Sequence, residues 1–390
     1  MFKRVVLIVL DGVGCGALPD AEAYGDVGTQ TLQHVAESVG GVQLPTLQRL
    51  GLGNIVPLAG VAPCAEAQGC WGRMAERSAG KDSTTGHWEM AGVILTQPFR
   101  TYAQGFPDEI MQRFRQLAGV EALGNIAASG TEIIQQLGPE HLRSGRPIVY
   151  TSTDSVFQIA AHEEVMPLAD LYRLCEQMRH VLDSYQIGRV IARPFVGDPE
   201  TGFRRTSRRH DYSMEPPPML LDMLQQAGIP VHGVGKISDI FCGRGLARHW
   251  PTSGNSDGMH KTLAAFDQLL RGLVFTNLID FDMLYGHRND AQGFARALEQ
   301  FDRQLGEDLL PRLQADDLLI ITADHGCDPT MPGTDHTREH VPLIVCRGGA
   351  QVGKDLGLRS SFADISATLL DNFSLAVTLG DSFLSSLGES

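Results

Sequence analysis

Carboxylate and imidazole side chains follow apolar runs of this chain, at the points where buried strands are expected to end. The run at 318–321 is followed by Asp324 and His325, and the run at 4–10 ends at Asp11. Open α/β sheets carry their sites at the carboxyl ends of parallel strands, so both runs predict functional side chains at one edge of a sheet. Taken alone, the Asp324–His325 pair is equally compatible with a simple loop cap.

Two further loops supply the same kinds of side chain. The apolar run at 273–279 is followed by Asp282, with His287 five residues later, and His336 precedes the apolar run at 341–345. A turn relaxed by Gly286 would let Asp282 and His287 reach one cation. The candidate ligands are three carboxylates and three imidazoles, namely Asp11, Asp282, His287, Asp324, His325 and His336. Six mixed oxygen and nitrogen donors fit two divalent cations better than one.

The densest polar cluster lies at residues 80–89, which read Gly-Lys-Asp-Ser-Thr-Thr-Gly-His-Trp-Glu. Three adjacent hydroxyls, Ser83, Thr84 and Thr85, predict a nucleophile loop that leads into a helix, whose first amides can hold phosphate. The alternative is a Ser/Thr-rich helix cap, which needs one hydroxyl and gives the other polar residues no role. Two cations beside such a hydroxyl would lower its pKa and support in-line phosphoryl transfer.

The alternation of strands and helices indicates an α/β fold with a central, mostly parallel sheet flanked by helices, including a long helix over 291–313. Between residues 98 and 212 the chain has its own strands and helices and ends in a basic, proline-rich run. We therefore expect a discontinuous metal-binding catalytic core, residues 1–97 and 213–390, and an inserted α+β cap and substrate domain, residues 98–212.

Charge and composition exclude several classes of partner. The net charge of −14 over 390 residues argues against nucleic acid and anionic membranes as partners. No run of about 18 apolar residues is present, and the N-terminus leads into a strand without a signal-peptide pattern, so we expect a cytoplasmic protein. The seven cysteines are scattered and lack a Cys-x-x-Cys motif, which disfavours a disulfide framework and a zinc knuckle.

Together these motifs resemble the alkaline phosphatase superfamily and, within it, the bacterial phosphopentomutases. The resemblance runs from Arg4 to the last strand, and the segments that carry it most specifically are 80–89, 150–155, 188–195, 280–288 and 333–339. It implies an alkaline-phosphatase-like core with an inserted cap domain.

The resemblance also implies two manganese ions, other divalent cations being possible. Asp11, Asp324 and His325 would hold one ion together with the oxygen of Ser83, the catalytic nucleophile, and the remaining three candidate ligands would hold the other. The family usually has Thr where this chain has Ser83, so Thr84 and Thr85 stay as weaker candidates. It usually has Asn where this chain has Cys327, a change that could alter how the neighbouring ligands are oriented.

The activity implied is the interconversion of ribose or 2-deoxyribose 1-phosphate and 5-phosphate in nucleoside and pentose phosphate salvage. It would proceed through a phosphoserine enzyme and a 1,5-bisphosphate, after a sugar bisphosphate activator has phosphorylated the enzyme. The residues expected to contact the sugar phosphate are Ser152, Asp154, Arg189 and Lys236, with Arg193 and Arg209 as lesser candidates. The expected partners are small-molecule sugar phosphates, and the expected protein is a monomer.

Two other functions compete with this one. A phosphomonoesterase or another mutase, such as the phosphoglycerate type, would share the metal loops, and a metal-dependent sugar-phosphate binding protein would share the ligand set without catalysis. The segments 150–155 and 188–195 favour the pentose enzyme, because they lie in the insert and match its family.

Overall fold

The computed structural model describes residues 1–152, 155–349 and 352–387. The chain divides into two compact units, Met1–Gln97 with Pro216–Ser390, called the core unit, and Pro98–Glu215, called the insert unit. The insert unit ends at Glu215 and not at residue 212 as expected from the sequence. The reason is strand pairing, because Ser213 pairs with Arg189 inside the insert sheet.

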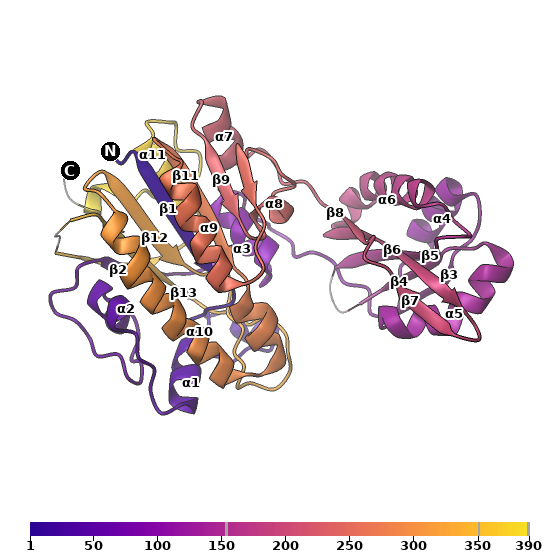
Figure 1. Ribbon diagram of the computed structural model, residues 1–390, viewed down its shortest axis with the longest axis horizontal. Helices are drawn as coiled ribbons and strands as arrows, with labels where there is room; N and C mark the ends of the chain where they lie inside the picture. Colours follow the sequence, from indigo (N-terminus) through magenta and orange to yellow (C-terminus); the bar gives the residue numbers. More distant parts are fainter. Residues whose placement is uncertain (153–154, 350–351, 388–390) are drawn as a thin grey trace. The chain divides into compact units, whose positions relative to one another are not determined.

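Eight strands form the sheet of the core unit, in the order β10-β9-β11-β1-β12-β13-β2-β14 (Figure 1). Strand β13 runs antiparallel to both of its neighbours, and the other pairings are parallel. The strands are β1 (Arg4–Leu10), β2 (Cys70–Met74), β9 (Val231–Val234), β10 (Arg248–Trp250), β11 (Gly272–Leu278), β12 (Asp317–Thr322), β13 (Val341–Arg347) and β14 (Asp355–Arg359). The expected α/β class with a mostly parallel sheet is confirmed.

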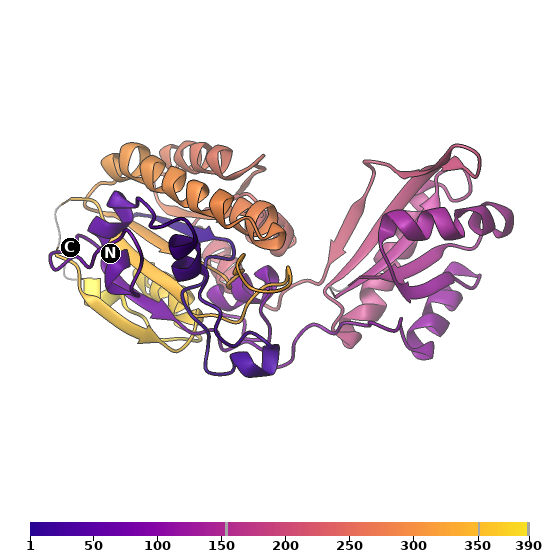
Figure 2. The ribbon, with the colours of Figure 1, turned by 90° about the horizontal axis from the view of Figure 1, so that it is seen from below.

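Helices cover both faces of this sheet, which explains why its central strands are apolar throughout and not alternating. Every residue of β1 from Val5 to Leu10 is buried, as expected for a strand with a parallel neighbour on each side. Helices α9 and α10 lie over one face, and α3, α7 and α11 lie on the other (Figure 2). The helices of the core unit are α1 (Thr31–Ser38), α2 (Pro45–Leu50), α3 (Ser83–Met90), α7 (Leu220–Gln226), α8 (Ile237–Ile240), α9 (Asn255–Asp267), α10 (Ala291–Gln304) and α11 (Ala363–Asn372).

The helix expected over 291–313 is not a regular α-helix to its end. Helix α10 stops at Gln304 and continues as a π-helical turn, Leu305–Leu309, and a 3-10 turn, Leu310–Arg312. Pro311 lies in the last turn, where its missing N–H cannot serve an α-helical hydrogen bond.

The insert unit has a mixed sheet in the order β3-β4-β5-β6-β7, with β8 also paired to β6. Two separate apolar clusters cover its faces, one formed with α4 and α6 and the other with α5. The elements are β3 (Leu123–Ala127), β4 (Ile148–Thr151), β5 (Val156–His162), β6 (Arg189–Asp198), β7 (Gly202–Arg205), β8 (His210–Ser213), α4 (Asp108–Ala118), α5 (Gly130–Ser144) and α6 (Leu168–Leu182). Each unit therefore has its own core.

Among the described residues, no helix has both the length and the apolar character needed to cross a membrane. All seven cysteines are free thiols.

Candidate metal centre

The register of three central strands brings the candidate carboxylates to one edge of the core sheet. Strand β1 pairs in parallel with β11 and with β12, so that Leu10 lies opposite Leu278, and Val9 opposite Thr322. Asp11, Asp282 and Asp324 follow these strands within a few residues. Segments far apart in the sequence therefore deliver their acidic side chains to the same place.

The first ligand group consists of Asp11, Asp324 and His325, whose ligand atoms all lie within 4.8 Å of one another. His325 Nε2 is 3.3 Å from Asp11 Oδ1 and 3.6 Å from Asp324 Oδ2, and all three side chains are buried. The backbone N–H of Gly12 donates to Asp324 Oδ1 at 3.1 Å. Gly12 has a φ of 80°, a conformation that favours glycine and turns the chain immediately after Asp11.

The second ligand group is centred on Asp282, which lies between two imidazoles. Its Oδ2 is 3.3 Å from His287 Nε2, and its Oδ1 is 3.3 Å from His336 Nε2. His287 Nδ1 contacts the carbonyl oxygen of Thr334 at 2.5 Å, which leaves Nε2 facing the carboxylate. The rings of His325 and His336 are 4.1 Å apart between centroids, so the two groups adjoin.

Buried ligand atoms face other side chains of the site without well-aligned hydrogen bonds. Asp282 Oδ1 and His336 Nε2 are 3.3 Å apart, and Asp324 Oδ2 is 3.1 Å from His87 Nδ1, but the geometry of these contacts is not that of a hydrogen bond. Burying a carboxylate oxygen without a good hydrogen bond is unfavourable, and a cation in each group would remove that cost. The residues therefore fit two divalent cations, in agreement with their mixed nitrogen and oxygen donors.

The carboxylates and imidazoles of the site shift one another's pKa values. Burial opposes ionisation of Asp282, but the adjacent imidazoles of His287 and His336 hold the pKa of this carboxyl well below its usual range. The hydrogen bond to Asp282 raises the pKa of His287. Burial lowers the pKa of His325, but the carboxylates of Asp324 and Asp11 raise it by more. The pKa of His325 is therefore well above its ordinary value. Cation binding would therefore displace protons from this site.

The hydroxyl of Ser83 reaches the first ligand group. Ser83 is the first residue of α3, and its Oγ donates to Asp11 Oδ1 at 3.2 Å and lies 3.2 Å from His325 Nε2. Thr85 is buried, and its hydroxyl donates to Asp82 Oδ2 at 2.5 Å. Thr85 is therefore committed to the helix cap.

Asn277 and His87 support both Asp11 and Ser83; the sequence predicted His87 as part of the nucleophile loop and predicted no role for Asn277. Asn277 Nδ2 donates to Asp11 Oδ2 at 2.8 Å and lies 3.3 Å from His87 Nε2. Nδ1 of His87 is 2.8 Å from the carbonyl oxygen of Ser83. Because a carbonyl oxygen can only accept, we assign the ring proton of His87 to Nδ1. The sequence feature that could have indicated a role for Asn277 is its polar amide within the otherwise apolar run of β11.

Arg338 fixes the loop that precedes Ser83. This role of Arg338 was not predicted from the sequence. One guanidinium nitrogen donates to the carbonyl oxygens of Ser78 and Gly80 at 2.9 and 2.6 Å, and to Glu76 Oε2 at 2.7 Å. Arg338 is buried. A buried arginine satisfied by carbonyl groups positions backbone, and no local sequence pattern predicts which loop it will contact.

The candidate substrate residues are divided between the two units. Lys236 follows β9 in the core unit, and its charge helps to lower the pKa of Asp11. Ser152 and Arg189 belong to the insert unit, where Arg189 is 3.7 Å from Asp211. Asp154 lies outside the described residues.

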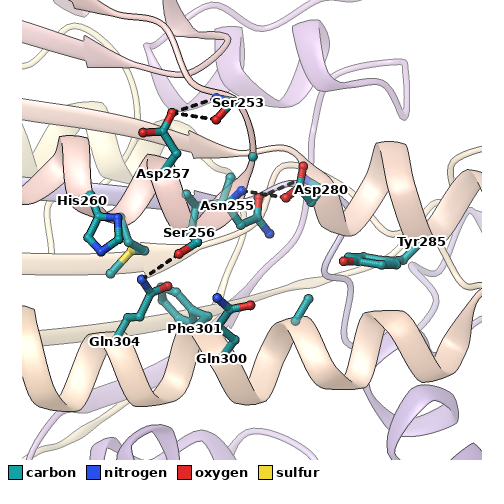
Figure 3. A pocket seen from close by; sticks show the side chains of 14 residues that line it. Ser253, Asn255, Ser256, Asp257, His260, Asp280, Tyr285, Gln300, Phe301 and Gln304 are labelled. Carbon is teal, nitrogen blue, oxygen red and sulfur yellow. Dashed lines mark hydrogen bonds between the residues drawn. The ribbon is translucent and has the colours of Figure 1, made fainter.

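A separate cavity of about 440 Å³ lies between α9 and α10 (Figure 3). Its wall includes Asp280, which accepts from the N–H of Asn255 at 2.6 Å and donates its own N–H to Asn255 Oδ1 at 2.9 Å. These bonds fix the start of α9 to the chain that leads into Asp282. None of the six candidate ligands lines this cavity.

Comparisons with known proteins identify relatives over almost the whole chain. The model of the Metalloenzyme superfamily matches residues 3–377. The phosphopentomutase of Syntrophotalea carbinolica is 62% identical over 387 residues, which cover 99% of this chain and 98% of the relative. The phosphopentomutase of Caldanaerobacter subterraneus subsp. tengcongensis is 56% identical over 390 residues, with the same coverage. The solved structure of the PH0037 protein from Pyrococcus horikoshii aligns with 97% of this chain at 16% identity and a TM-score of 0.51, which shows a shared fold.

Proposed function

The chain belongs to the phosphopentomutase family of the Metalloenzyme superfamily, and we propose that it interconverts the 1-phosphate and 5-phosphate of ribose or 2-deoxyribose in nucleoside and pentose phosphate salvage. Membership of this family makes the chain a mutase, an enzyme of the isomerase class. The observation that carries the proposal for its mechanism is the position of Ser83 Oγ, 3.2 Å from Asp11 Oδ1 and 3.2 Å from His325 Nε2.

Ser83 acts as the nucleophile. In the phosphorylated enzyme, the Oγ–phosphorus bond of Ser83 breaks as a sugar hydroxyl oxygen bonds to phosphorus, the hydroxyl proton passes to the released Ser83 oxygen directly or through solvent, and a 1,5-bisphosphate results. Ser83 then takes the other phosphoryl group, so that the sugar leaves with its phosphate moved. A sugar bisphosphate activator phosphorylates Ser83 before the first cycle.

Asp11, Asp324 and His325 would hold one cation with the Ser83 oxygen, and Asp282, His287 and His336 would hold the other. The buried atoms of Asp282, Asp324 and His336 that lack well-aligned hydrogen bonds among the described residues support this assignment. When bound, two Mn²⁺ or similar divalent cations lower the pKa of the Ser83 hydroxyl and offset the charge of the transferring phosphoryl group. Asn277 and His87 keep Asp11 and the backbone of Ser83 in position.

The sugar phosphate is bound by Lys236 of the core unit and by Ser152, Asp154 and Arg189 of the insert unit. A mutase must keep water away from its phosphoserine, because hydrolysis would make it a phosphatase. We assign this task to the insert unit as a cap domain. The enzyme acts as a cytoplasmic monomer on small-molecule sugar phosphates.

The test combines mass spectrometry with an activity assay. The protein loaded with Mn²⁺ and a sugar bisphosphate is expected to yield a phosphorylated peptide that spans residues 81–88, and to convert ribose 5-phosphate into ribose 1-phosphate. Ser83→Ala is expected to lose transfer by orders of magnitude and to keep its fold, because the covalent step has no substitute. Retained turnover in Ser83→Ala would contradict the assignment.

The matched control is Thr84→Ala, which removes the neighbouring hydroxyl and should leave the phosphopeptide in place. Release of free phosphate without ribose 1-phosphate would identify a hydrolase. Ligand binding without either product would identify a binding protein.

A further inference from the structure

The thiol of Cys327 lies among the candidate ligands of the second cation. Asp282, His287 and Cys327 each offer one ligand atom, and these atoms lie within 4.8 Å of one another. Cys327 is buried, with 1% of its surface exposed. Two glycines leave room for this arrangement, because a methyl group added at Gly12 would lie 3.0 Å from Cys327 Cβ, and one added at Gly286 would overlap Sγ.

Cys327 differs in this respect from the other thiols. In the part of the chain that the structure describes, none of the other six cysteines belongs to a group of candidate ligands. Cys346, for example, is also buried, but it lies within β13 opposite Leu319 of β12. The position of Cys327 is therefore a property of the site and not of buried cysteines in general.

The polar contacts of the thiol are weak. Its contact with the carbonyl oxygen of Asp335 is 3.9 Å long, which is long even for sulfur. A second polar neighbour is the buried carboxylate of Asp282, to which a thiol can donate only a weak S–H hydrogen bond. A cation held jointly by the carboxylate and the sulfur would satisfy both groups better.

We propose that Cys327 is a ligand of the second cation, together with Asp282 and His287, and that it shifts this site away from Mn²⁺ and toward thiophilic cations such as Zn²⁺ and Co²⁺. Sulfur is a soft donor that selects these cations over manganese, for which carboxylate oxygens are better suited. On binding, the sulfur–cation bond replaces the S–H bond, and the proton leaves to solvent. The proposal rests on the two-cation function proposed above.

The decisive measurement is the absorption spectrum of the full chain loaded with Co²⁺. A sulfur–cobalt bond gives a strong charge-transfer band in the near ultraviolet, whereas oxygen and nitrogen ligands do not. We expect this band in the unmodified protein and in Cys346→Ser, the matched control. We expect its loss in Cys327→Ser and in Cys327→Asn, which offers a second substitution if the serine variant fails to fold.

A competition titration between Zn²⁺ and Mn²⁺ provides the second readout. Loss of the sulfur should lower the preference for Zn²⁺ by about tenfold or more in Cys327→Ser, on the scale of losses seen when metal sites lose supporting groups. The same titration of Cys346→Ser should match the unmodified protein.

The outcomes separate this inference from the proposed function. Two bound Co²⁺ ions without a charge-transfer band, or a band that persists in Cys327→Ser, would overturn the role of Cys327 and leave the metal centre intact. A protein that binds no Co²⁺ at all would overturn the metal centre, and the ligand role of Cys327 with it.

Discussion

Asp282 shows at the scale of single residues how one carboxylate can serve a whole cation site, since each of its oxygens faces a different imidazole at 3.3 Å. We expect Asp282→Asn to bind one divalent cation where the unmodified protein binds two, because the first ligand group does not include Asp282. Transfer activity should fall by at least about a hundredfold, as one cation of a two-metal site is lost.

Metal analysis of the dialysed protein checks this expectation. Asp267→Asn, which alters a carboxylate paired on the surface with Arg312, is the control and should bind both cations. Two cations retained by Asp282→Asn would show that the second site does not depend on this carboxylate.

The candidate ligands of the site could be proposed from the sequence. The residues that hold the ligand loops in place, such as Arg338, could not. Asp11, Asp282 and Asp324 stand after apolar runs, and local patterning is enough to place such residues at strand ends. Arg338 acts on Gly80 through a contact across more than 250 residues of sequence, which no periodicity encodes. Placement of Asp154 stays a prediction, because this residue lies outside the described part of the chain.

At the scale of elements, the start of α3 determines where the Ser83 hydroxyl points. Asp82 accepts from the N–H and the hydroxyl of Thr85 at 3.1 and 2.5 Å. We expect Asp82→Ala to destabilise the core unit by about 1 kcal/mol, the usual cost of a lost helix cap, and to lower transfer activity. Urea unfolding followed by tryptophan fluorescence measures the stability, because all three tryptophans, Trp71, Trp88 and Trp250, belong to the core unit.

The control for this cap is Gln30→Ala. Gln30 precedes α1 and makes no side-chain cap hydrogen bond, so its loss should leave the stability of the core unit unchanged. Equal effects of both substitutions would argue against a capping role for Asp82.

In the insert unit, a buried histidine ties α5 to β5. The Nε2 of His141 accepts from the N–H of His162 at 2.8 Å, and its Nδ1 lies 2.7 Å from the carbonyl oxygen of Arg146. Burial lowers the pKa of His141. A pKa that is lower in the folded state means that the unfolded chain binds the proton more readily, so the contribution of His141 is present above its ordinary pKa of about 6.5 and is lost as pH falls below it.

We therefore expect the insert unit to open more readily at pH 5.5 than at pH 7.5. Hydrogen exchange of peptides from residues 130–162, measured by mass spectrometry, reports this opening. In His141→Gln, whose amide can make both hydrogen bonds without titrating, the difference between the two pH values should shrink. His180→Gln, at an exposed histidine, should retain it.

The elements themselves were predictable where one physical rule dominates. Strands β1 and β12 are uninterrupted apolar runs, which is typical of parallel strands covered on both faces. The antiparallel direction of β13 was not predictable, since an apolar strand reads alike in either direction and the connection decides. The π-helical turn at Phe281–Tyr285 could not be predicted either, because its residues are equally compatible with an ordinary α-helix.

At the scale of the whole molecule, the chain places all of its proposed cation ligands and Ser83 in the core unit. The core chain on the two sides of the insert is joined a few residues from the boundaries, because the N–H of Leu220 donates to the carbonyl oxygen of Ala91 at 2.9 Å. We expect a variant in which a short Gly/Ser linker replaces residues 98–215 to fold and to bind two cations.

The same variant should lose mutase activity, because Ser152, Asp154 and Arg189 are removed with the insert. Tryptophan fluorescence and metal analysis test the fold and the cation sites, and an assay with ribose 5-phosphate tests transfer. A linker variant that still forms ribose 1-phosphate at the full rate would exclude a substrate role for the insert unit.

The sequence indicated the start of the second unit at Pro98, where a segment with its own strands and helices begins. The other boundary was placed three residues too early, because proline-rich composition marks a linker only coarsely, whereas the pairing of Ser213 with Arg189 decides where the unit ends. How a strand pairs is a long-range property that composition does not report.

The position of β13 between β12 and β2 has a consequence for the nascent chain on the ribosome. Strand β2, made early, has no neighbour in the sheet until residues 341–359 have been translated, because both of its partners, β13 and β14, come from that segment. The insert unit is continuous in sequence and can complete its fold during this wait. Since His336 is also translated late, a product truncated before this residue would lack part of the proposed cation site, so the site is completed only when the sheet is.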